Sequence, residues 1–499
     1  MAIQSFPITP STSGKSPRWT QPVSFYGQSV FSKYYAHSIC VFLLLVPFLI
    51  SPAAAQGQGA IGGQNCVTNY NAADNVDYFP SKISDPGSDQ ERVVDNAALF
   101  KVRYANNYKV VTNTAGKKDY VLYQCGTTAP AASEFANGTI FISVPVTAAA
   151  ALTTTSVAFI EMLGKRSALK VVDTEGLVSS PCVQLGLEKG EIVGLEDANK
   201  TLRAEQFKGA DVIFGDGFSV ENGTESKTVG TSEVSDPGPL NRAEWLEFYS
   251  TFFNLEESAQ KLTGSINNNY NCFKAAANAK ATKPIVAWSS YVAPSSYNNN
   301  TASWTLSGAD YKKILTVDAG AAFYNGTDKN TFTTSAEFLA SIKDVDVIID
   351  ETFAGSDLTA FLTSYGLTTA DTANYKFLAN KAVFREDGLV NPNDGRDWFS
   401  GAVAMGDAVL QDVIRAVHPD ALPKDVKYNW LRNIVNGEPK QVLTSSNCTA
   451  TDASTPVPDR AIVCSTMKLD GSSGSAANKA VAGSALTAFV GLLAAALLF

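Results

Sequence analysis

Acidic side chains at the ends of predicted strands are candidate ligand contacts. Asp350 and Glu351 close the buried run DVIIDE, and Asp216 follows DVIFG in the same way. Adjacent residues of a strand point to opposite faces, so at most one of Asp350 and Glu351 faces a cleft. Ligands of open α/β sheets bind beyond the carboxyl ends of the strands, although many such acids only cap the next helix. We expect Glu351 and Asp216 near a ligand.

A second candidate is the stretch GRDWFSGAVAMGDAVLQDVIRAVHP at residues 395–419. A turn led by glycine presents Trp398 and Phe399, and an amphipathic helix follows. The helix ends at His418, the only histidine after residue 55. An imidazole at a helix C-terminus interacts favourably with the helix dipole. We therefore predict that His418 ends a helix and that the RDWF loop forms a cleft wall.

The sequence lacks the motifs of common catalytic sites. It contains no GxxxxGK[ST], HExxH or GxSxG pattern. GQGAIG at 57–62 matches GxGxxG, but no strand precedes it, so we expect a flexible start. With a single histidine after residue 55, a three-histidine metal site within one chain is excluded. These features predict a protein that is not an enzyme and holds no cofactor or protein-bound metal.

Strands alternate with helices along most of the chain. Tyr108–Val111 and Asp119–Gln124 flank NTAGKK and predict a β-hairpin. Residues 138–146 predict a strand, followed by a helix to about Gly164 and a strand at Leu169–Val172. The run ADVIFGDGF predicts a further buried strand. This alternation is typical of parallel α/β layers.

The middle of the chain predicts one long helix. Aromatic residues recur at helical spacing from Trp245 to Phe253, and no proline interrupts the run from Arg242 to about Ala279. A second strand–helix series begins with KPIVAWSSY at 283–291. We predict an α/β fold of two Rossmann-like lobes joined by one long helix, with a ligand cleft between the lobes. The expected divisions are an N-terminal lobe at 56–240, a linking helix at 241–279 and a C-terminal lobe at 280–440.

The two ends of the chain look like processing signals. Residues 1–55 contain no acid and finish in an apolar run and AAA, which predicts a secretory signal peptide; a signal anchor or a transit segment is the alternative. Residues 474–499 follow small residues and end in an apolar tail, which predicts a GPI-attachment signal rather than a plain membrane helix. We expect a protein anchored by lipid to the outer face of the plasma membrane.

The charge and the cysteines agree with a secreted protein. Without the two signals, Lys and Arg fall from 39 to 35 while Asp and Glu stay at 48, a charge of −13 that disfavours nucleic acid as a partner. Six cysteines remain, so we expect disulfides, with Cys448–Cys464 as the first guess among 15 pairings. The disulfide candidates are Cys66, Cys125, Cys182, Cys272, Cys448 and Cys464. The N-x-[ST] sites are Asn137, Asn199, Asn222, Asn299, Asn325 and Asn447.

The order of segments resembles helical-backbone (class III) periplasmic substrate-binding proteins, which serve ferric siderophores, cobalamin and haem. The matching segments are VDYFPSKI, NNYKVVTN, DYVLYQCGTTAP, ISVPVTAAAALTTTSVAFIEMLG, NRAEWLEFYSTFFNLEESAQ, WTLSGADYKKILTVDAGA and the 395–419 stretch with HPDALP. The resemblance covers about residues 66–435. It implies that the protein captures a ferric siderophore for uptake, with an uptake or reductase partner at the cell surface.

The resemblance also suggests which side chains meet the ligand. Iron in a siderophore is already coordinated, so a receptor needs aromatic walls and a few polar groups rather than His or Cys ligands. Arg385 is the expected contact for an anionic iron–oxygen centre. The other candidates in the second lobe are Trp288, Tyr291, Trp304, Trp398 and Phe399, and those in the first lobe are Thr153–Thr155, Thr174 and Glu175.

The chain departs from the family in ways that keep alternatives open. Family members present a glutamate from each lobe to an ABC permease, whereas this chain has Ser156, with Glu161 a turn later, and Asp310 in those regions. The GPI-type tail, the N-x-[ST] sites and the disulfide-like cysteines together point to a eukaryotic cell, which has no periplasm. The alternatives are a surface protein that binds cobalamin or haem, an adhesion or wall protein that kept the fold, and a hydrolase that uses acidic residues.

Overall fold

The computed structural model describes residues 63–83, 92–93, 95–173, 175–196, 198–215 and 223–466. The expected signal peptide, the GQGAIG start and the GPI-attachment signal lie outside these residues, as do Thr174, Asp216 and Asn222. No helix among the described residues has the length and hydropathy that a membrane span requires.

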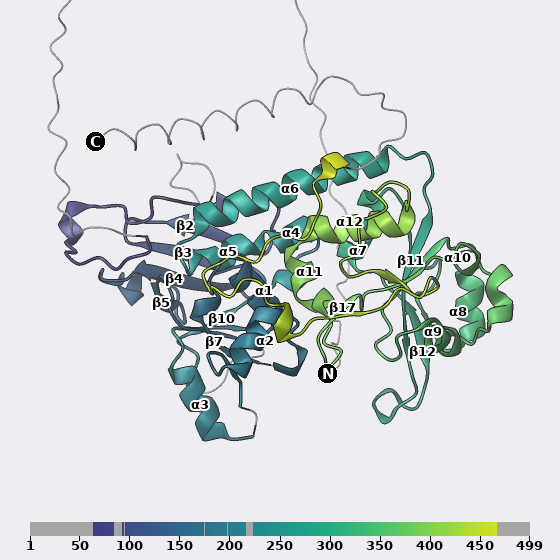
Figure 1. The fold of residues 1–499 in the computed structure, drawn as a ribbon. Helices are drawn as coiled ribbons and strands as arrows, with labels where there is room; N and C mark the ends of the chain where they lie inside the picture. Colours follow the sequence, from purple (N-terminus) through teal and green to yellow (C-terminus); the bar gives the residue numbers. More distant parts are fainter. Residues whose placement is uncertain are drawn as a thin grey trace, which may run out of the picture. The chain divides into compact units, whose positions relative to one another are not determined.

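The N-terminal lobe contains two five-stranded sheets (Figure 1). The first runs in the order β1-β2-β3-β4-β5, with the expected antiparallel hairpin between β3 and β4 and with β5 parallel to β4. The second runs in the order β10-β9-β6-β7-β8 and is parallel throughout. The strands are β1 (Arg92–Val93), β2 (Phe100–Tyr104), β3 (Tyr108–Asn113), β4 (Lys118–Gln124), β5 (Ile140–Val144), β6 (Ala149–Ala151), β7 (Leu169–Val172), β8 (Val193–Gly194), β9 (Val212–Gly215) and β10 (Thr228–Gly230).

The alanine run after β5 corrects one prediction. We expected Ala149–Ala151 to belong to a helix, but these residues form the central strand of the parallel sheet, paired with β7 and β9. They are fully buried, and the burial of a central strand on both faces outweighs the helix propensity of alanine. The helix α1 (Thr154–Met162) begins only after Thr153, whose hydroxyl caps it. Helices α2 (Pro181–Glu188) and α3 (Lys200–Lys208) complete the lobe.

The link between the lobes is a chain of three helices rather than one continuous helix. It consists of α4 (Pro239–Ala243), α5 (Trp245–Thr251) and α6 (Glu256–Asn278). The break before α6 falls at Asn254, which has a φ of 51°, a left-handed conformation that asparagine tolerates better than most residues. Its side chain donates to Gln124 Oε1 at 2.9 Å and accepts from Lys109 Nζ at 2.7 Å. These bonds tie the break to the N-terminal lobe.

The C-terminal lobe is built on a mixed seven-stranded sheet. Its order is β14-β12-β11-β15-β16-β18, with β13 also paired to β11. The strands are β11 (Ile285–Val292), β12 (Ser303–Leu306), β13 (Ala322–Tyr324), β14 (Thr331–Phe332), β15 (Val347–Asp350), β16 (Val383–Arg385) and β18 (Arg432–Asn433). The helices are α7 (Asp310–Asp318), α8 (Ser335–Ser341), α9 (Leu358–Tyr365), α10 (Lys376–Ala379), α11 (Gly401–Ala404) and α12 (Gly406–Val417).

The helix α12 confirms the interpretation of His418. The helix ends at Val417, and His418 is its C-cap residue. The imidazole is buried, with 3.2 Å between His418 Nε2 and Gly320 O. This histidine is therefore part of the helix end and the core beside it.

The disulfides confirm that all six cysteines pair but overturn the Cys448–Cys464 guess. The three disulfides are Cys66–Cys125, Cys182–Cys448 and Cys272–Cys464. Cys448 is joined to α2 of the N-terminal lobe and Cys464 to α6, because the segment after β19 (Gln441–Val442) returns across the molecule (Figure 1). β19 itself pairs with β17 (Leu389–Val390) in the C-terminal lobe.

Candidate functional site

A hollow of about 290 Å³ lies between the lobes, and we call it the aromatic groove. It is lined from both lobes and from the link by Val234, Pro239, Arg242, Tyr311, Leu315, Trp398, Phe399, Ala402, Val403 and Val409. Its walls are mostly apolar, and Arg242 is the only charged side chain among the lining residues. Such a combination suits a ligand with an apolar body and some negative charge.

Trp398 and Phe399, predicted from sequence as a cleft wall, both line the groove. They lie on the short helix η8 (Asp397–Phe399), which leads into α11. Trp398 is 5% exposed and packs against Trp288, with 5.9 Å between the ring centroids. Phe399 is 52% exposed. One ring is therefore fixed by the core, and the other is available to a ligand.

Arg242 and Tyr311 form the polar part of the groove. The Arg242 guanidinium lies 3.7 Å from the centroid of the Tyr311 ring, a cation–π contact. Two backbone carbonyls hold the guanidinium: Nε donates to Asp236 O at 2.9 Å, and one amino nitrogen donates to Val234 O at 2.6 Å. Burial, followed by the charges of nearby glutamates, raises the pKa of Tyr311 far above its usual value, so the hydroxyl stays protonated.

Two acids follow the parallel strands β15 and β16 near the groove. Glu351 pairs with Lys312, and Glu386 accepts from an Arg396 amino nitrogen at 3.1 Å. Burial, with the neighbouring charge of Glu351, raises the pKa of Glu386 to about 8. Glu386 is only 1% exposed. A substrate in the groove therefore does not reach this carboxylate without a rearrangement.

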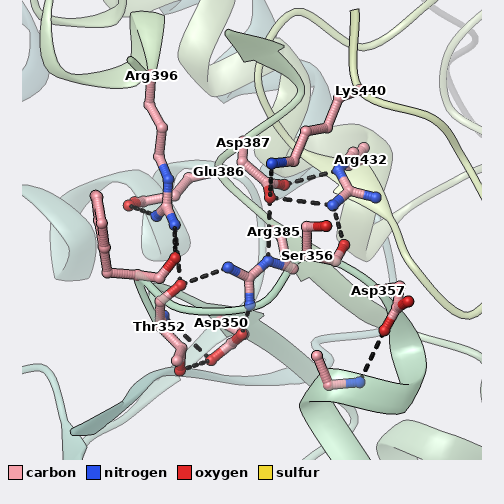
Figure 2. A network of polar contacts seen from close by, with 12 residues as sticks. Asp350, Thr352, Ser356, Asp357, Arg385, Glu386, Asp387, Arg396, Arg432 and Lys440 are labelled. Carbon is pink, nitrogen blue, oxygen red and sulfur yellow. Dashed lines mark hydrogen bonds and ion pairs between the residues drawn. The ribbon is translucent and has the colours of Figure 1, made fainter. Parts of the chain in front are cut away.

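Arg385 lies in a buried charge network, which differs from the role predicted for it (Figure 2). Its guanidinium pairs with Asp350 and Asp387 and donates to Thr352 O. The side chain is 1% exposed, and each of its three nitrogens already donates a hydrogen bond. The strand-end arginine is held by acids from adjacent segments, so it braces the sheet and is not presented to a ligand.

The remaining aromatic candidates do not line the groove. Trp288 is fully buried behind Trp398 and donates from Nε1 to Thr316 Oγ1 at 3.0 Å. Tyr291 and Trp304 pair across β11 and β12, with ring centroids 5.1 Å apart, and Trp304 donates to Ser364 O. Trp288 thus supports the groove from behind, whereas Tyr291 and Trp304 belong to the separate core cluster of the C-terminal lobe.

The candidates of the N-terminal lobe, Thr153–Thr155 and Glu175, have different surroundings. Thr154 Oγ1 donates to Phe399 O at 3.2 Å, a direct contact with the groove-forming segment. Thr153 caps α1, and the Thr155 hydroxyl donates to buried Glu233. Glu175, in the short helix η4 (Glu175–Leu177), is exposed. None of these residues lines the groove.

The acid considered for permease docking is covered. Glu161 is 4% exposed, and its backbone carbonyl accepts from Val457 N of the returning C-terminal segment at 3.0 Å. Burial raises the pKa of the Glu161 carboxyl to about 7. Ser156, one turn earlier, is buried against the Tyr249 hydroxyl. Asp310 starts α7. Neither Glu161 nor Ser156 forms an accessible docking feature.

Sequence reasoning missed Arg242, Tyr311, Lys312 and Arg396. Arg242 and Tyr311 come from helices whose residues pattern as ordinary amphipathic segments, so no local motif marks them. Among the described residues, no group of three or more His, Cys, Asp or Glu side chains could hold a metal ion. The N-x-[ST] asparagines in the described part are exposed, as glycan attachment requires: Asn137, Asn199, Asn299, Asn325 and Asn447.

Comparison with known proteins finds likeness only among solved structures. No protein-family model matches the chain, and no curated protein matches it. A periplasmic heme-binding protein from Pseudomonas aeruginosa is 14% identical, with a TM-score of 0.42, and the match covers 58% of this chain and 98% of that one.

Two further solved structures show a similar likeness. A petrobactin-binding protein from Bacillus subtilis is 13% identical, with a TM-score of 0.37, over 55% of this chain and 92% of that one. An ABC-type Fe3+-hydroxamate transport protein from Saccharomonospora viridis is 15% identical, with a TM-score of 0.38, over 54% of this chain and 93% of that one. These neighbours bind or transport different ligands. A likeness at this level therefore does not extend to the ligand of this chain.

Proposed function

We propose that the protein binds an iron–siderophore complex, or a chemically similar ferric chelate, in the aromatic groove. The observation that carries the proposal is the lining of the groove, which Trp398 and Phe399 share with Tyr311 and with the cation of Arg242 that lies over the Tyr311 ring. A chelate that already satisfies its iron needs contact area and complementary charge rather than His or Cys ligands. Arg242 supplies the positive charge for an anionic chelate.

The size of the groove favours partial burial of such a ligand. About 290 Å³ lies at the lower end of ligand pockets. The groove therefore holds one face of the chelate, while the rest stays in solvent. Phe399, half exposed, extends the apolar contact beyond the groove.

The proposed place of action is the outer face of the plasma membrane. Its support is the apolar leader, the apolar C-terminal tail, the three disulfides and the exposed N-x-[ST] asparagines. An uptake system or a reductase at the same surface would receive the iron. We propose a binding protein rather than a hydrolase, because the glutamate that follows β16 is buried and paired with Arg396.

Calorimetric titration with a ligand panel tests the proposal. The panel contains a ferric hydroxamate, a ferric catecholate, haem and cobalamin, with the iron-free siderophores as controls. Val234→Trp places a large side chain at an exposed position of the groove and should abolish binding. Val292→Trp, at an exposed position on β11 outside the groove, should leave binding unchanged. If only haem or only cobalamin binds, that compound and not a siderophore is the ligand of the groove. If no member of the panel binds, the proposal is rejected.

A further inference from the structure

The C-terminal segment 441–466, which we call the strap, crosses from one lobe to the other. It begins as β19, which pairs with β17 of the C-terminal lobe. The disulfide Cys182–Cys448 then attaches it to α2 of the N-terminal lobe. The disulfide Cys272–Cys464 attaches its far end to α6 of the link. The strap is therefore covalently joined to two different parts of the molecule.

Between the two disulfides, the strap is bound closely to the N-terminal lobe. An Arg166 amino nitrogen donates to Ala450 O at 2.5 Å and to Asp452 O at 3.1 Å. Val457 N donates to Glu161 O of α1 at 3.0 Å. Gly164, with a φ of 66°, lies so near the strap that a Cβ there would be 2.5 Å from Ser454 O. The strap backbone is thus fixed along its length rather than only at its ends.

The strap next contacts the C-terminal lobe and the linking helix. Arg460 pairs with Asp397 of η8, and Ile462 N donates to Gln411 Oε1 of α12 at 2.8 Å. Cys464 N donates to Asn269 Oδ1 of α6 at 2.8 Å. One short segment therefore holds the N-terminal lobe, the C-terminal lobe and the link together.

The lobes also touch directly beside the strap. Asn391 Nδ2 donates to Gly176 O at 2.8 Å and to Val178 O at 3.1 Å. A Cβ at Gly395 would lie 2.7 Å from Leu177 Cα, so the two backbones are in contact. A second cavity of about 140 Å³ remains between α1, α11 and the strap. Any rotation of one lobe against the other would have to break these contacts and stretch the strap.

We propose that the strap is a covalent clamp that holds the two lobes at a fixed separation, so that a ligand enters and leaves the aromatic groove without lobe closure. The clamp depends on Cys182–Cys448, because residues 443–447 join this disulfide directly to β19 of the C-terminal lobe. Cys272–Cys464 fixes only the far end of the strap to the linking helix. The inference concerns the lobes and does not depend on which ligand the groove takes.

Hydrogen exchange of the ligand-free protein tests the clamp. The double variant Cys182→Ser with Cys448→Ser releases the strap from the N-terminal lobe, and Cys272→Ser with Cys464→Ser releases its far end from α6. Neither variant leaves a free thiol. If the clamp holds the lobes, loss of Cys182–Cys448 should raise exchange at 175–180 in the N-terminal lobe and at 389–400 in the C-terminal lobe together by about tenfold. Loss of Cys272–Cys464 keeps the lobes connected and should change exchange at these two segments far less. Cys66→Ser with Cys125→Ser removes a disulfide within the N-terminal lobe and should leave both segments unchanged.

Arg460→Gln provides a test that keeps all three disulfides. It removes the ion pair with Asp397 and the contact of the guanidinium with the Trp430 ring, and it should raise exchange at the same two segments by a smaller factor. If exchange rises only within 441–466 in Cys182→Ser with Cys448→Ser and in Arg460→Gln, the lobes hold each other without the strap, and the clamp is rejected. Since no ligand is present, this outcome is independent of whether the groove binds a chelate.

Discussion

Ser179 of the N-terminal lobe donates a hydrogen bond to Asp397 of the C-terminal lobe, with 2.6 Å between Ser179 Oγ and Asp397 Oδ1. The other carboxylate oxygen accepts from Trp430 Nε1 at 2.8 Å and pairs with Arg460 of the strap. The Asp397 side chain is buried. A single carboxylate therefore connects both lobes and the strap, immediately before the groove residue Trp398.

Replacing this carboxylate should destabilise the protein. Asp397→Ala leaves the donors of Ser179, Trp430 and Arg460 without their acceptor, and it should lower the free energy of unfolding by about 2–4 kcal/mol. Asp394→Asn, which removes the charge of an exposed acid paired with Lys440 and keeps a residue that tolerates the φ of 59° at this position, should cost no more than about 0.5 kcal/mol. Urea unfolding measures both values. Equal losses of unfolding free energy in the two variants would contradict the claim that the Asp397 carboxylate connects the lobes and the strap.

Removal of the disulfide Cys182–Cys448 should also lower stability. The bond closes a loop with a sequence separation of 266 residues and so restricts the unfolded chain strongly. Replacement of both cysteines by serine should cost about 2–5 kcal/mol, measured by urea unfolding of the non-reduced protein. The disulfide Cys66–Cys125 closes a shorter loop, so the variant with Cys66→Ser and Cys125→Ser should lose less free energy of unfolding. A variant without Cys182–Cys448 that is as stable as wild type would show that the strap adds nothing to stability.

The buried Asp407 of α12 should make the protein less stable as the pH rises. Burial, followed by the charge of Asp459 in the strap, raises the pKa of Asp407 to about 8. Between the unfolded pKa of about 4 and the folded value, the native state binds one more proton than the unfolded state. Stability contributed by this proton is complete below about pH 4 and is lost as the pH rises toward 8.

Asp407→Asn removes the group that binds this extra proton in the native state. The amide can donate to Asp459 in place of the carboxyl proton, so the fold is retained. Between pH 5 and 8, the slope of unfolding free energy against pH should become less negative by up to about 1.4 kcal/mol per pH unit. Asp420→Asn, at an exposed position, should leave the slope unchanged. Identical slopes for wild type and Asp407→Asn would contradict a shared proton between α12 and the strap.

The two arginines near the groove should separate binding from stability. Arg242→Met keeps the apolar stem but removes the cation over Tyr311, and it should weaken binding of an anionic chelate by about 1–2 kcal/mol, with little loss of stability. Arg385→Met leaves Asp350 without a cation in the core, while Asp387 keeps its pairing with Arg432, and it should cost about 3–5 kcal/mol of stability. The affinity of the folded Arg385→Met protein should equal that of wild type. If Arg385→Met weakened binding and Arg242→Met did not, Arg385 and not Arg242 would be the ligand contact.

Local sequence patterns predicted much of the fold. The features that they did not predict depend on contacts between residues far apart in the sequence. The hairpin of β3 and β4 and the end of α12 at His418 follow from neighbouring residues alone. The strand Ala149–Ala151 does not, because its conformation depends on burial between two other strands. The helix break at Asn254 depends on partners far away in the sequence, such as Gln124. The path of the strap decides the disulfide pairing in the same way.

The candidate site shows the same division. The aromatic loop at Trp398 and Phe399 was predicted because the aromatic pair stands between a turn led by glycine and an amphipathic helix. Arg242 and Tyr311 were not, because only the folding of α4 against α7 brings them together. Arg385 looked like a free cation at a strand end, and the acids that hold it lie on a neighbouring strand and in the following turn. Sequence thus indicated which residue types form the groove but not which charge faces it.

Tryptophan fluorescence tests the central claim most directly, because Trp398 lines the groove and Trp288 lies 5.9 Å behind it. Titration with a ferric hydroxamate should quench the emission in a saturable way, and the iron-free hydroxamate should quench it far less. In Trp398→Phe the quenching amplitude should fall, because the ring nearest the iron is lost. A ligand that binds elsewhere would leave the amplitude in this variant unchanged. No saturable response to a ferric hydroxamate, a ferric catecholate, haem or cobalamin would contradict the account.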